Sequence, residues 1–496
     1  VVMMRDGTRT VLSMQNNYEG PPADFAMVVP VPVVLQQDDV RTLPPEIFDR
    51  VDALAAPRLV EYWEQDPCYV EEIYEDYGPP PAPTSVAEFS AKRSRASRDL
   101  GVTVEAQFAV GEYDIVILSA KDSGGLDTWL RREKYKIPKG AANVLRPYVA
   151  SGMKFFVAKV NAKKVDVSRG KVMLSPLRFH YDSKNFSLPI RLGMLNANGP
   201  QDLIVHILAR EVRYAVANYD NRAIPTNLEV SDATRDKFGQ FYASLFDRVL
   251  EQHPKSVITE YAWSAGSCDP CPTEVLSMEE LSKLGADVLP TYQRALSGRA
   301  PSELRWKMPS DFVLTRLHAR YDSSNLGEDL IFRAADGIAG GRETVGADGQ
   351  LEQGATPSSM NNFQARYAIR HRWEGLVECA EPRYGIWGGP PAELQRAVDP
   401  NSPAIARDLA FVDRSAKLES FLTDRVVELD DGSAPKLPHG SAQAPDPDPI
   451  KPLRGGRSRG ESNRGAGCAG CQGDSQPPIA ALGVSFFLLA ARRRRR

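Results

Sequence analysis

The regular spacing of apolar residues that a folded domain needs stops near Val427 in this chain of 496 residues. Residues 433–463 are instead rich in proline, serine, glycine and charge, and they include the run Pro-Asp-Pro-Asp-Pro at 445–449. Such a composition cannot bury enough apolar surface to offset the entropy of ordering the chain. The sequence therefore predicts a folded body followed by a disordered tether over residues 428–478, semi-rigid where proline dominates.

The last segment, residues 479–496, differs in kind from the tether. An apolar stretch over 479–491 is closed by a cluster of arginines. A helix of that length spans about 20 Å, short of the roughly 30 Å hydrocarbon core of a bilayer. Arginine side chains can snorkel and the membrane can thin, so we expect a hydrophobic helix that anchors the chain in a membrane at least transiently. The alternative is a disordered basic tail with an accidental apolar run. The cluster consists of Arg492, Arg493, Arg494, Arg495 and Arg496.

Charge separates the body from the tail in the same way. Residues 451–496 contain ten basic and two acidic residues, which leaves 51 basic and 62 acidic residues in 1–450, a net charge of -11. An acidic body argues against nucleic acid as a partner, because nucleic-acid binding needs a basic surface. Arginines in a block stay on the cytoplasmic side of a membrane, so the body is expected to face outward. We therefore predict an exported protein on the outer surface or periplasmic side of a cell envelope.

Alternating and helical periodicities in the body predict a strand-rich α+β fold with antiparallel sheets and several helices. Residues 8–34 read as a β-hairpin around a turn at 16–22, and residues 102–110 and 113–118 read as paired strands. Helices are expected after Pro45, near 126–130, over 141–149 and over 234–253, and Ser277 with Glu280 forms a capping box before another. We divide the body into α+β regions at 1–160 and 161–427.

A short internal echo raises the possibility of a duplicated β module. The sequence Tyr-Asp-Ser-Lys-Asn-Phe at 181–186 returns as Tyr-Asp-Ser-Ser-Asn-Leu at 321–326, and each copy follows a histidine, His180 or His318. Strand, polar turn, strand is the shared unit, which is typical of repeats. The alternative is that Asp-Ser and Asn are simply what tight turns use.

Six cysteines form two close pairs and one distant pair. Cys68 and Cys379 could form a long-range disulfide in an oxidising compartment, or remain two unpaired, half-buried thiols, since sequence does not establish connectivity. Cys268 and Cys271, in Cys-Asp-Pro-Cys, are the sharpest chemical signal in the body. Two thiols at this spacing can form a reactive disulfide, a structural loop disulfide, or half of a metal site. Pro272 follows directly and no βαβ pattern surrounds the pair, so the structural disulfide is favoured over redox chemistry.

The remaining motifs point to no enzyme class. The six histidines (His180, His206, His253, His318, His371 and His439) are scattered, and no HExxH, phosphate-loop or Gly-x-Ser-x-Gly arrangement occurs. We therefore expect no metal, no cofactor and no catalytic residues, and the ligand stays open. The chain also begins directly in strand-like sequence, so an export signal is expected upstream of Val1.

Two resemblances follow from these residues. Cys468 or Cys471, the short apolar helix and the terminal arginines together resemble the myxobacterial-type C-terminal sorting signal, MYXO-CTERM. That resemblance implies processing near one of the two cysteines, by export and sorting machinery, and attachment to the cell surface. The stretches at 23–32, 145–148, 152–156, 175–179 and 188–192 resemble a bacterial domain-of-unknown-function family, number 2330, which implies no known activity.

Together these features predict a secreted, envelope-anchored protein that acts by binding or as structure. The alternative is an envelope thiol-disulfide protein that uses Cys268 and Cys271.

Overall fold

The structure is a computed structural model, and its described residues belong to the body of the chain. Residues 1–449 form one compact unit, and residues 450–496 are grouped apart from it. The described residues are 1–15, 26–68, 98–99, 101–161, 164, 174–196, 199–294, 309–322, 325–346, 349–391, 403–407, 409, 412–423, 429 and 433–440. The predictions for the C-terminal helix, its arginines and Cys468 and Cys471 therefore lie outside the described residues.

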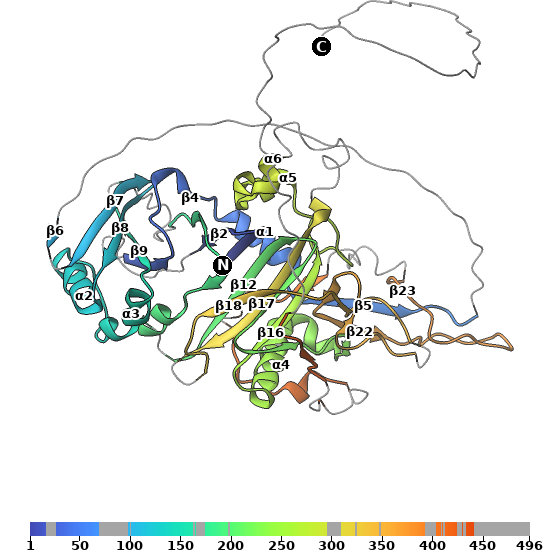
Figure 1. Cartoon of the computed structure of the whole chain (residues 1–496). Helices are drawn as coiled ribbons and strands as arrows, with labels where there is room; N and C mark the ends of the chain where they lie inside the picture. The colour runs from blue at the N-terminus through green and yellow to red at the C-terminus, as the bar shows by residue number, and fades with distance from the viewer. Residues whose placement is uncertain are drawn as a thin grey trace, which may run out of the picture. The chain divides into compact units, whose positions relative to one another are not determined.

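The largest sheet of the described residues has three long antiparallel strands at its centre (Figure 1). They are β12 (Gln201–Arg210), β17 (Phe312–Tyr321) and β16 (Ser256–Ser264), in that order. On the β12 side the sheet continues through β1 (Val2–Asp6), β2 (Arg9–Met14), β10 (Leu177–Asp182) and β4 (Val40–Thr42). On the β16 side it continues through β21 (Asn362–Gln364), β19 (Ile338–Gly340) and β20 (Thr356–Pro357), with β14 (Asp220–Ala223) and β25 (Lys436–Leu437) branching from β16.

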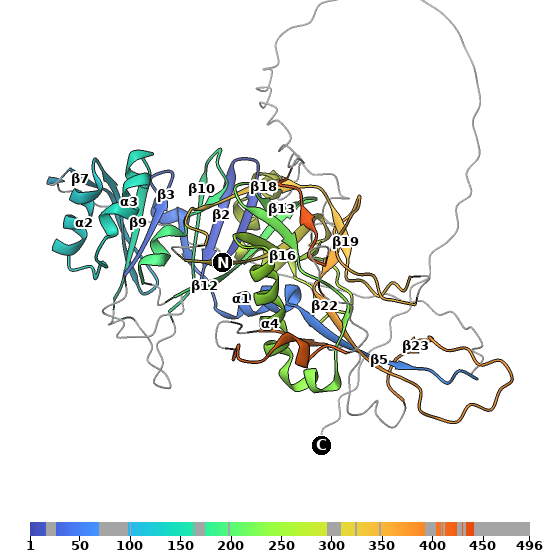
Figure 2. The same ribbon diagram turned by 90° about the horizontal axis from the view of Figure 1, so that it is seen from below.

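Helices α1 (Glu46–Ala55) and α4 (Phe238–Gln252) cover one face of the central strands, where Figure 2 shows both beside the sheet. Alternate residues of a strand share a face, so Leu314, Arg316 and His318 of β17 point to the same side. Leu314 packs with α1, and the His318 ring stacks on Phe246 of α4 at 3.7 Å between ring centroids. On the other face, Leu317 and Ala319 join the largest apolar cluster. The central strands are therefore buried on both faces.

Three smaller sheets complete the described part of the body. The first contains β3 (Ala26–Val31), β9 (Lys154–Val160), β8 (Tyr113–Ala120), β7 (Val102–Val110) and β6 (Arg98–Asp99), and it packs against α2 (Ser123–Arg132) and α3 (Ala141–Ala150). The second contains β15 (Leu228–Glu229), β22 (Arg366–His371), β5 (Arg58–Glu64), β23 (Trp387–Gly388) and β24 (Ala404–Ile405). The third contains β11 (Ser187–Leu188), β18 (Leu330–Ala335) and β13 (Arg213–Val216). Helices α5 (Met278–Leu284) and α6 (Pro290–Arg294) lie outside the sheets.

The predicted α+β class is confirmed, and so are most of the local elements. The strands around Gly111 pair as β7 and β8, and α1, α2, α3 and α4 occupy the predicted helical stretches. The capping box also forms, because Ser277 Oγ accepts from the Glu280 backbone N–H and the Glu280 carboxylate accepts from Ser277 N. Local signals were sufficient here because each element has its own start, stop and apolar face.

The predicted hairpin over residues 8–34 is wrong. Strand β2 pairs instead with β1 across the turn at Gly7, where a φ of +57° suits glycine, and with β10 on its other side. Strand β3 belongs to a different sheet, in which it pairs with β9. The alternation of each strand was read correctly, but the partners were not, because periodicity does not encode the partner of a strand.

The chain crosses the predicted boundaries in two places. Strands from both sides of residue 160 share the central sheet, since β1 pairs with β12 and β2 pairs with β10. At the other end, packed structure extends through residue 440 into the segment predicted to be a tether. There β25 pairs with β14, and Ala434 and Leu437 are buried.

The two copies of the sequence echo have different surroundings. His180 lies near Asp39 at 3.4 Å, whereas His318 is buried against Glu260. The apolar stretches that follow the two copies do meet, because β11 pairs antiparallel with β18 through Leu188 and Leu330. The two copies of the repeated sequence therefore precede β11 and β18, two strands that pair in one small sheet. The two histidines do not share a site.

Because Phe241 on α4 is fully buried against Tyr367 and Phe421, we expect Phe241→Ala to lower the free energy of unfolding by about 3–5 kcal/mol. The exposed Glu251 on the same helix provides the control, and Glu251→Ala should change stability by less than about 0.5 kcal/mol. Urea denaturation followed by circular dichroism measures both variants. Equal effects at the two positions would contradict the packing of α4 described above.

Candidate functional site

Four of the six cysteines lie in described residues, and the structure places them in two pairs at disulfide distance. Cys68 lies next to Cys379, which is 311 residues later in the chain, and Cys268 lies next to Cys271. The long-range pair joins the end of β5 to the loop that returns to β23, which runs beside it in Figure 2. Further bonds hold this loop, since Arg383 N donates to Pro67 O at 2.9 Å and Gly385 N to Glu64 Oε1 at 2.7 Å.

The Cys268–Cys271 loop lies against the protein through its backbone. Pro270 O accepts a 2.7 Å hydrogen bond from the buried Arg58, and Asp269 O accepts one from Gln364. Cys268 is partly buried and Cys271 is exposed. The next helix along the chain, α5, begins only at Met278, so neither cysteine belongs to the first turn of that helix, where a thiolate would be stabilised. The geometry is that of a short loop held closed over the protein interior.

A second feature is a buried group of ionisable side chains under α1 and α4. Glu260 on β16 is fully buried, and three side chains converge on its carboxylate. Arg316 Nε donates to one oxygen at 2.6 Å, while Tyr242 Oη and His318 Nδ1 lie 2.5 and 2.6 Å from the other. A register shift in β16 between Thr259 and Tyr261 places Glu260 at an irregularity, where a side chain can be redirected.

The charge of Glu260 is stabilised by these partners. Although burial by itself would raise its pKa, the neighbouring His318 and Arg316 lower the pKa of Glu260 to about 2. An ionised carboxylate only accepts hydrogen bonds, so His318 Nδ1 must carry the hydrogen. Arg316 also bonds Asp52 of α1 at 2.5 Å. His206 lies 3.6 Å from Asp52, and burial, followed by the charge of Arg316, lowers the pKa of His206 to about 3.

The ion pairs continue from this group to the surface. His318 Nε2 lies 3.9 Å from Asp202, which forms two hydrogen bonds with Arg320, at 2.7 and 3.1 Å. Arg320 also bonds Asp247 of α4 at 2.7 Å. Arg414 contacts both of these aspartates. This network of ion pairs therefore runs from Asp52 to α4 through strands β12, β16 and β17.

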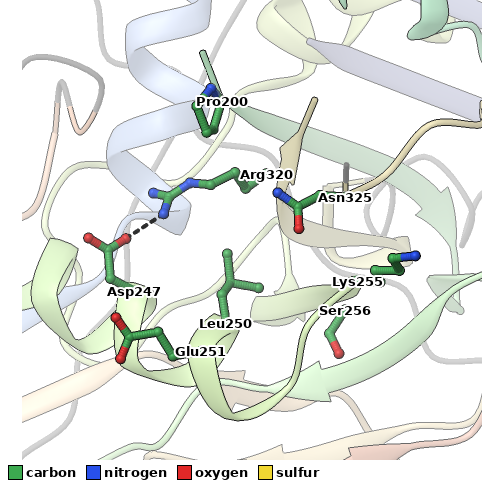
Figure 3. Close-up of a pocket in the computed structure, with 8 residues that line it drawn as sticks. All are labelled: Pro200, Asp247, Leu250, Glu251, Lys255, Ser256, Arg320 and Asn325. Atoms are coloured by element: carbon green, nitrogen blue, oxygen red, sulfur yellow. Dashed lines mark hydrogen bonds and ion pairs between the residues drawn. The ribbon is translucent and has the colours of Figure 1, made fainter. Parts of the chain in front are cut away.

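An open cavity of about 320 Å³ lies beside Arg320 and Asp247, where this network of ion pairs ends (Figure 3). Figure 3 shows the Arg320 guanidinium pointing toward Asp247, and Leu250 and Glu251 follow Asp247 on α4. Ser256 also lines it, although its Oγ is buried and has no hydrogen-bond partner in the described part of the chain. The lining residues are Pro200, Asp247, Leu250, Glu251, Lys255, Ser256, Arg320 and Asn325. Both charge signs line the cavity, so it suits a polar ligand.

This arrangement can bind and hold charge, but it shows no assembled nucleophile. Glu260 is inaccessible and is fully occupied by its partners. Arg320 is likewise committed to two carboxylates. Among the described residues, no group of three or more histidine, cysteine or acidic side chains could hold a metal ion. In the same part of the chain, no helix is long and apolar enough to cross a membrane.

Sequence reasoning missed the whole buried group. His318 was singled out only as an echo of His180, and Glu260 was not singled out at all. The available signal was the placement of Glu260, Arg316 and His318 within otherwise apolar, fully buried strands, where charged residues are rare unless paired. Which residues pair depends on the register between β16 and β17, and the sequence does not state that register.

We expect Glu260→Gln to lower the free energy of unfolding by about 3–5 kcal/mol at neutral pH, because it leaves Arg316 buried with half of its ion pairing. The folded-state pKa of Glu260 lies near 2, below its ordinary 4.5, so its contribution is present above about pH 4.5 and is lost as the pH falls toward 2. The difference between wild type and variant should shrink over that interval. Urea denaturation across pH, with the exposed Glu251→Gln as control, measures it. A difference that is independent of pH would contradict an ionised Glu260.

Comparison with known proteins gives the family. Residues 1–333 match the family described as "Uncharacterized protein conserved in bacteria (DUF2330)". No curated protein matches the chain, and no solved structure does. The match covers the central strands, the buried ionic group and the Cys268–Cys271 loop, whereas Cys379 and Arg414 lie beyond it. Since it spans well over half of the 496 residues, the chain belongs to the bacterial DUF2330 family.

Proposed function

We propose that this protein is exported, stabilised by disulfides, held at the cell envelope through its C-terminal tail, and active by binding rather than by chemistry. The observation that carries the proposal is the pairing of Cys68 with Cys379 and of Cys268 with Cys271 at disulfide distance. Disulfides persist in oxidising compartments outside the cytoplasm and are rare in reducing ones. Two geometrically suitable pairs in one body therefore favour an exported protein.

The tail supports the second part of the proposal. It combines a candidate cysteine, a short apolar stretch and a terminal arginine block, which is the order of elements in the sorting signal that it resembles. The apolar stretch is short for a permanent span. We therefore favour processing near Cys468 or Cys471, with transfer to a surface anchor, over a lasting transmembrane helix.

A role in binding follows from the open cavity beside α4. Its walls offer Lys255, Asn325 and Glu251 around the apolar Leu250, beside the ion-paired Arg320 and Asp247. Small-molecule sites usually combine apolar walls with a few such polar groups. The buried ion pairs behind Arg320 hold its guanidinium in place, so the wall of the cavity is rigid at that point.

Anchoring can be tested in the native bacterial host. The mature protein should fractionate with membranes or the cell surface, and mass spectrometry should find its C-terminus near Cys468 or Cys471. A variant with glutamine at all five positions 492–496 should lose that processing, whereas Arg454→Gln in the tether should not. Recovery of an intact, unmodified C-terminus from the soluble fraction would overturn the anchoring proposal.

The alternative function as a thiol-disulfide protein rests on the exposed Cys271 next to a partly buried Cys268. The attachment of the loop to Arg58 and Gln364 favours a structural disulfide instead. We therefore expect no insulin reduction by the wild-type protein. The Cys268→Ser/Cys271→Ser double variant should lose about 2 kcal/mol of stability, because the disulfide closes a very short loop.

The second cysteine pair is the matched control for this experiment. Cys68→Ser/Cys379→Ser removes a disulfide across a far longer loop, so it should cost more, up to about 5 kcal/mol. Insulin reduction that disappears in the Cys268/Cys271 double variant and persists in the control would establish the redox function instead.

A further inference from the structure

Two arginines lie side by side beneath the Cys268–Cys271 loop. Arg58 begins β5 and Arg366 begins β22, and the two residues are register partners in adjacent parallel strands. Their side chains therefore leave the sheet on the same face. Both are fully buried, and the face they share is opposite to the one that Leu59 and Tyr367 present to α4. Gln364, two residues before Arg366, donates to Asp269 O of the loop.

The hydrogen-bonding capacity of this pair is only partly used. Arg58 donates to Pro270 O at 2.7 Å and to Leu54 O at 2.8 Å, but its Nε has no hydrogen-bond partner among the described residues. Within the part of the chain that the structure describes, all three guanidinium nitrogens of Arg366 are buried without a hydrogen-bond partner. Arg58 stacks over Tyr261 and Arg366 over Tyr62, each at 5.4 Å from the ring centroid. Buried donors left in this state cost stability, so they call for an acceptor.

The charge of the pair is also incompletely balanced. Among the described residues, Arg366 lies within ion-pair distance of the Glu343 carboxylate, at 3.6 Å, and the Glu343 side chain is 53% exposed. Arg58 has no carboxylate within ion-pair distance in the described residues. Burial, followed by the nearby Arg58, lowers the pKa of Arg366 to about 9, while the partial burial of Glu343 and the charge of Asp269 raise the pKa of Glu343. Water could satisfy the donors, but it would not compensate two buried positive charges.

We propose that the Arg58–Arg366 pair beside the Cys268–Cys271 loop binds a small oxyanion, held by the guanidinium of Arg366 and by Nε of Arg58. Guanidinium groups bind phosphate, sulfate and carboxylate through paired, charge-assisted hydrogen bonds, so any of these fits. The loop contacts the pair through Pro270 O, and the exposed Glu343 is a carboxylate that competes for Arg366. The inference goes beyond the proposed binding at the cavity beside α4 and does not depend on export or anchoring.

The test is calorimetric titration of the purified full-length chain with inorganic phosphate, sulfate and acetate, at ionic strength held constant with sodium chloride. We expect saturable binding of one anion per chain, and the three probes separate a tetrahedral anion from a carboxylate. Arg366→Lys keeps the charge but loses the planar fork, so binding should weaken about tenfold. Glu343→Gln removes the competing carboxylate, so binding should tighten. Arg248→Gln, a change on α4 at a partly exposed ion pair with Glu419, should leave binding unchanged.

Several results would overturn the proposal. They are the absence of saturable binding in the wild type, equal binding by Arg366→Lys, and equal weakening by Arg248→Gln. If Arg366→Lys does not fold, the comparison of wild type with Glu343→Gln decides, by the rise in melting temperature with phosphate. A larger rise in Glu343→Gln supports the site. A destabilised Glu343→Gln without any response to phosphate would make Glu343 the permanent counter-ion of Arg366. These measurements are independent of cell fractionation, so failure here leaves the export proposal standing.

Discussion

The ion pair between Glu260 and Arg316 is the constraint on which the centre of this structure depends. Both side chains are fully buried, so neither can find water if its partner is removed. Glu260 is also bonded to His318 and Tyr242, and Arg316 to Asp52, which ties β16, β17, α1 and α4 to one carboxylate. Apolar packing alone would tolerate sliding of the helices over the sheet. The directional bonds to Glu260 select one arrangement.

The need of a buried charged group for partners also bears on the cavity beside Arg320 and on the arginine pair beside the Cys268–Cys271 loop. Arg320, where the network of ion pairs ends, is fully ion-paired with Asp202 and Asp247, and the open cavity lies beside it. Arg366 is more deeply buried, and its guanidinium has no hydrogen-bond partner among the described residues; the Cys268–Cys271 loop attaches to the sheet next to it. A saturated arginine makes a rigid wall, whereas an unsaturated one retains the capacity to bind an anion. The two sites therefore differ in what they offer a ligand, although both are built on arginines of the sheets.

Prediction from sequence succeeded where the information is local. The helices at α1 and α4, the capping box at Ser277 and the paired strands around Gly111 each depend on a few neighbouring residues. It failed where pairing is non-local. Strand β2 was assigned to β3 although it pairs with β1 and β10, and residues near Leu437 were assigned to a tether although they add a strand to β14. Alternation shows which face of a strand is apolar, but it does not specify which strand pairs with it or which other apolar surface it packs against.

The sequence by itself determined the α+β class, the positions of most helices, the acidic body and the distinct composition of the tail, because these follow from composition and short-range periodicity. It also supplied the cysteines without deciding their partners. Only the tertiary structure brought Cys68 to Cys379, Glu260 to Arg316 and Arg58 to Arg366, since each pair joins positions far apart in the chain. Their meeting depends on strand order and register, which are properties of the whole sheet that no short segment contains.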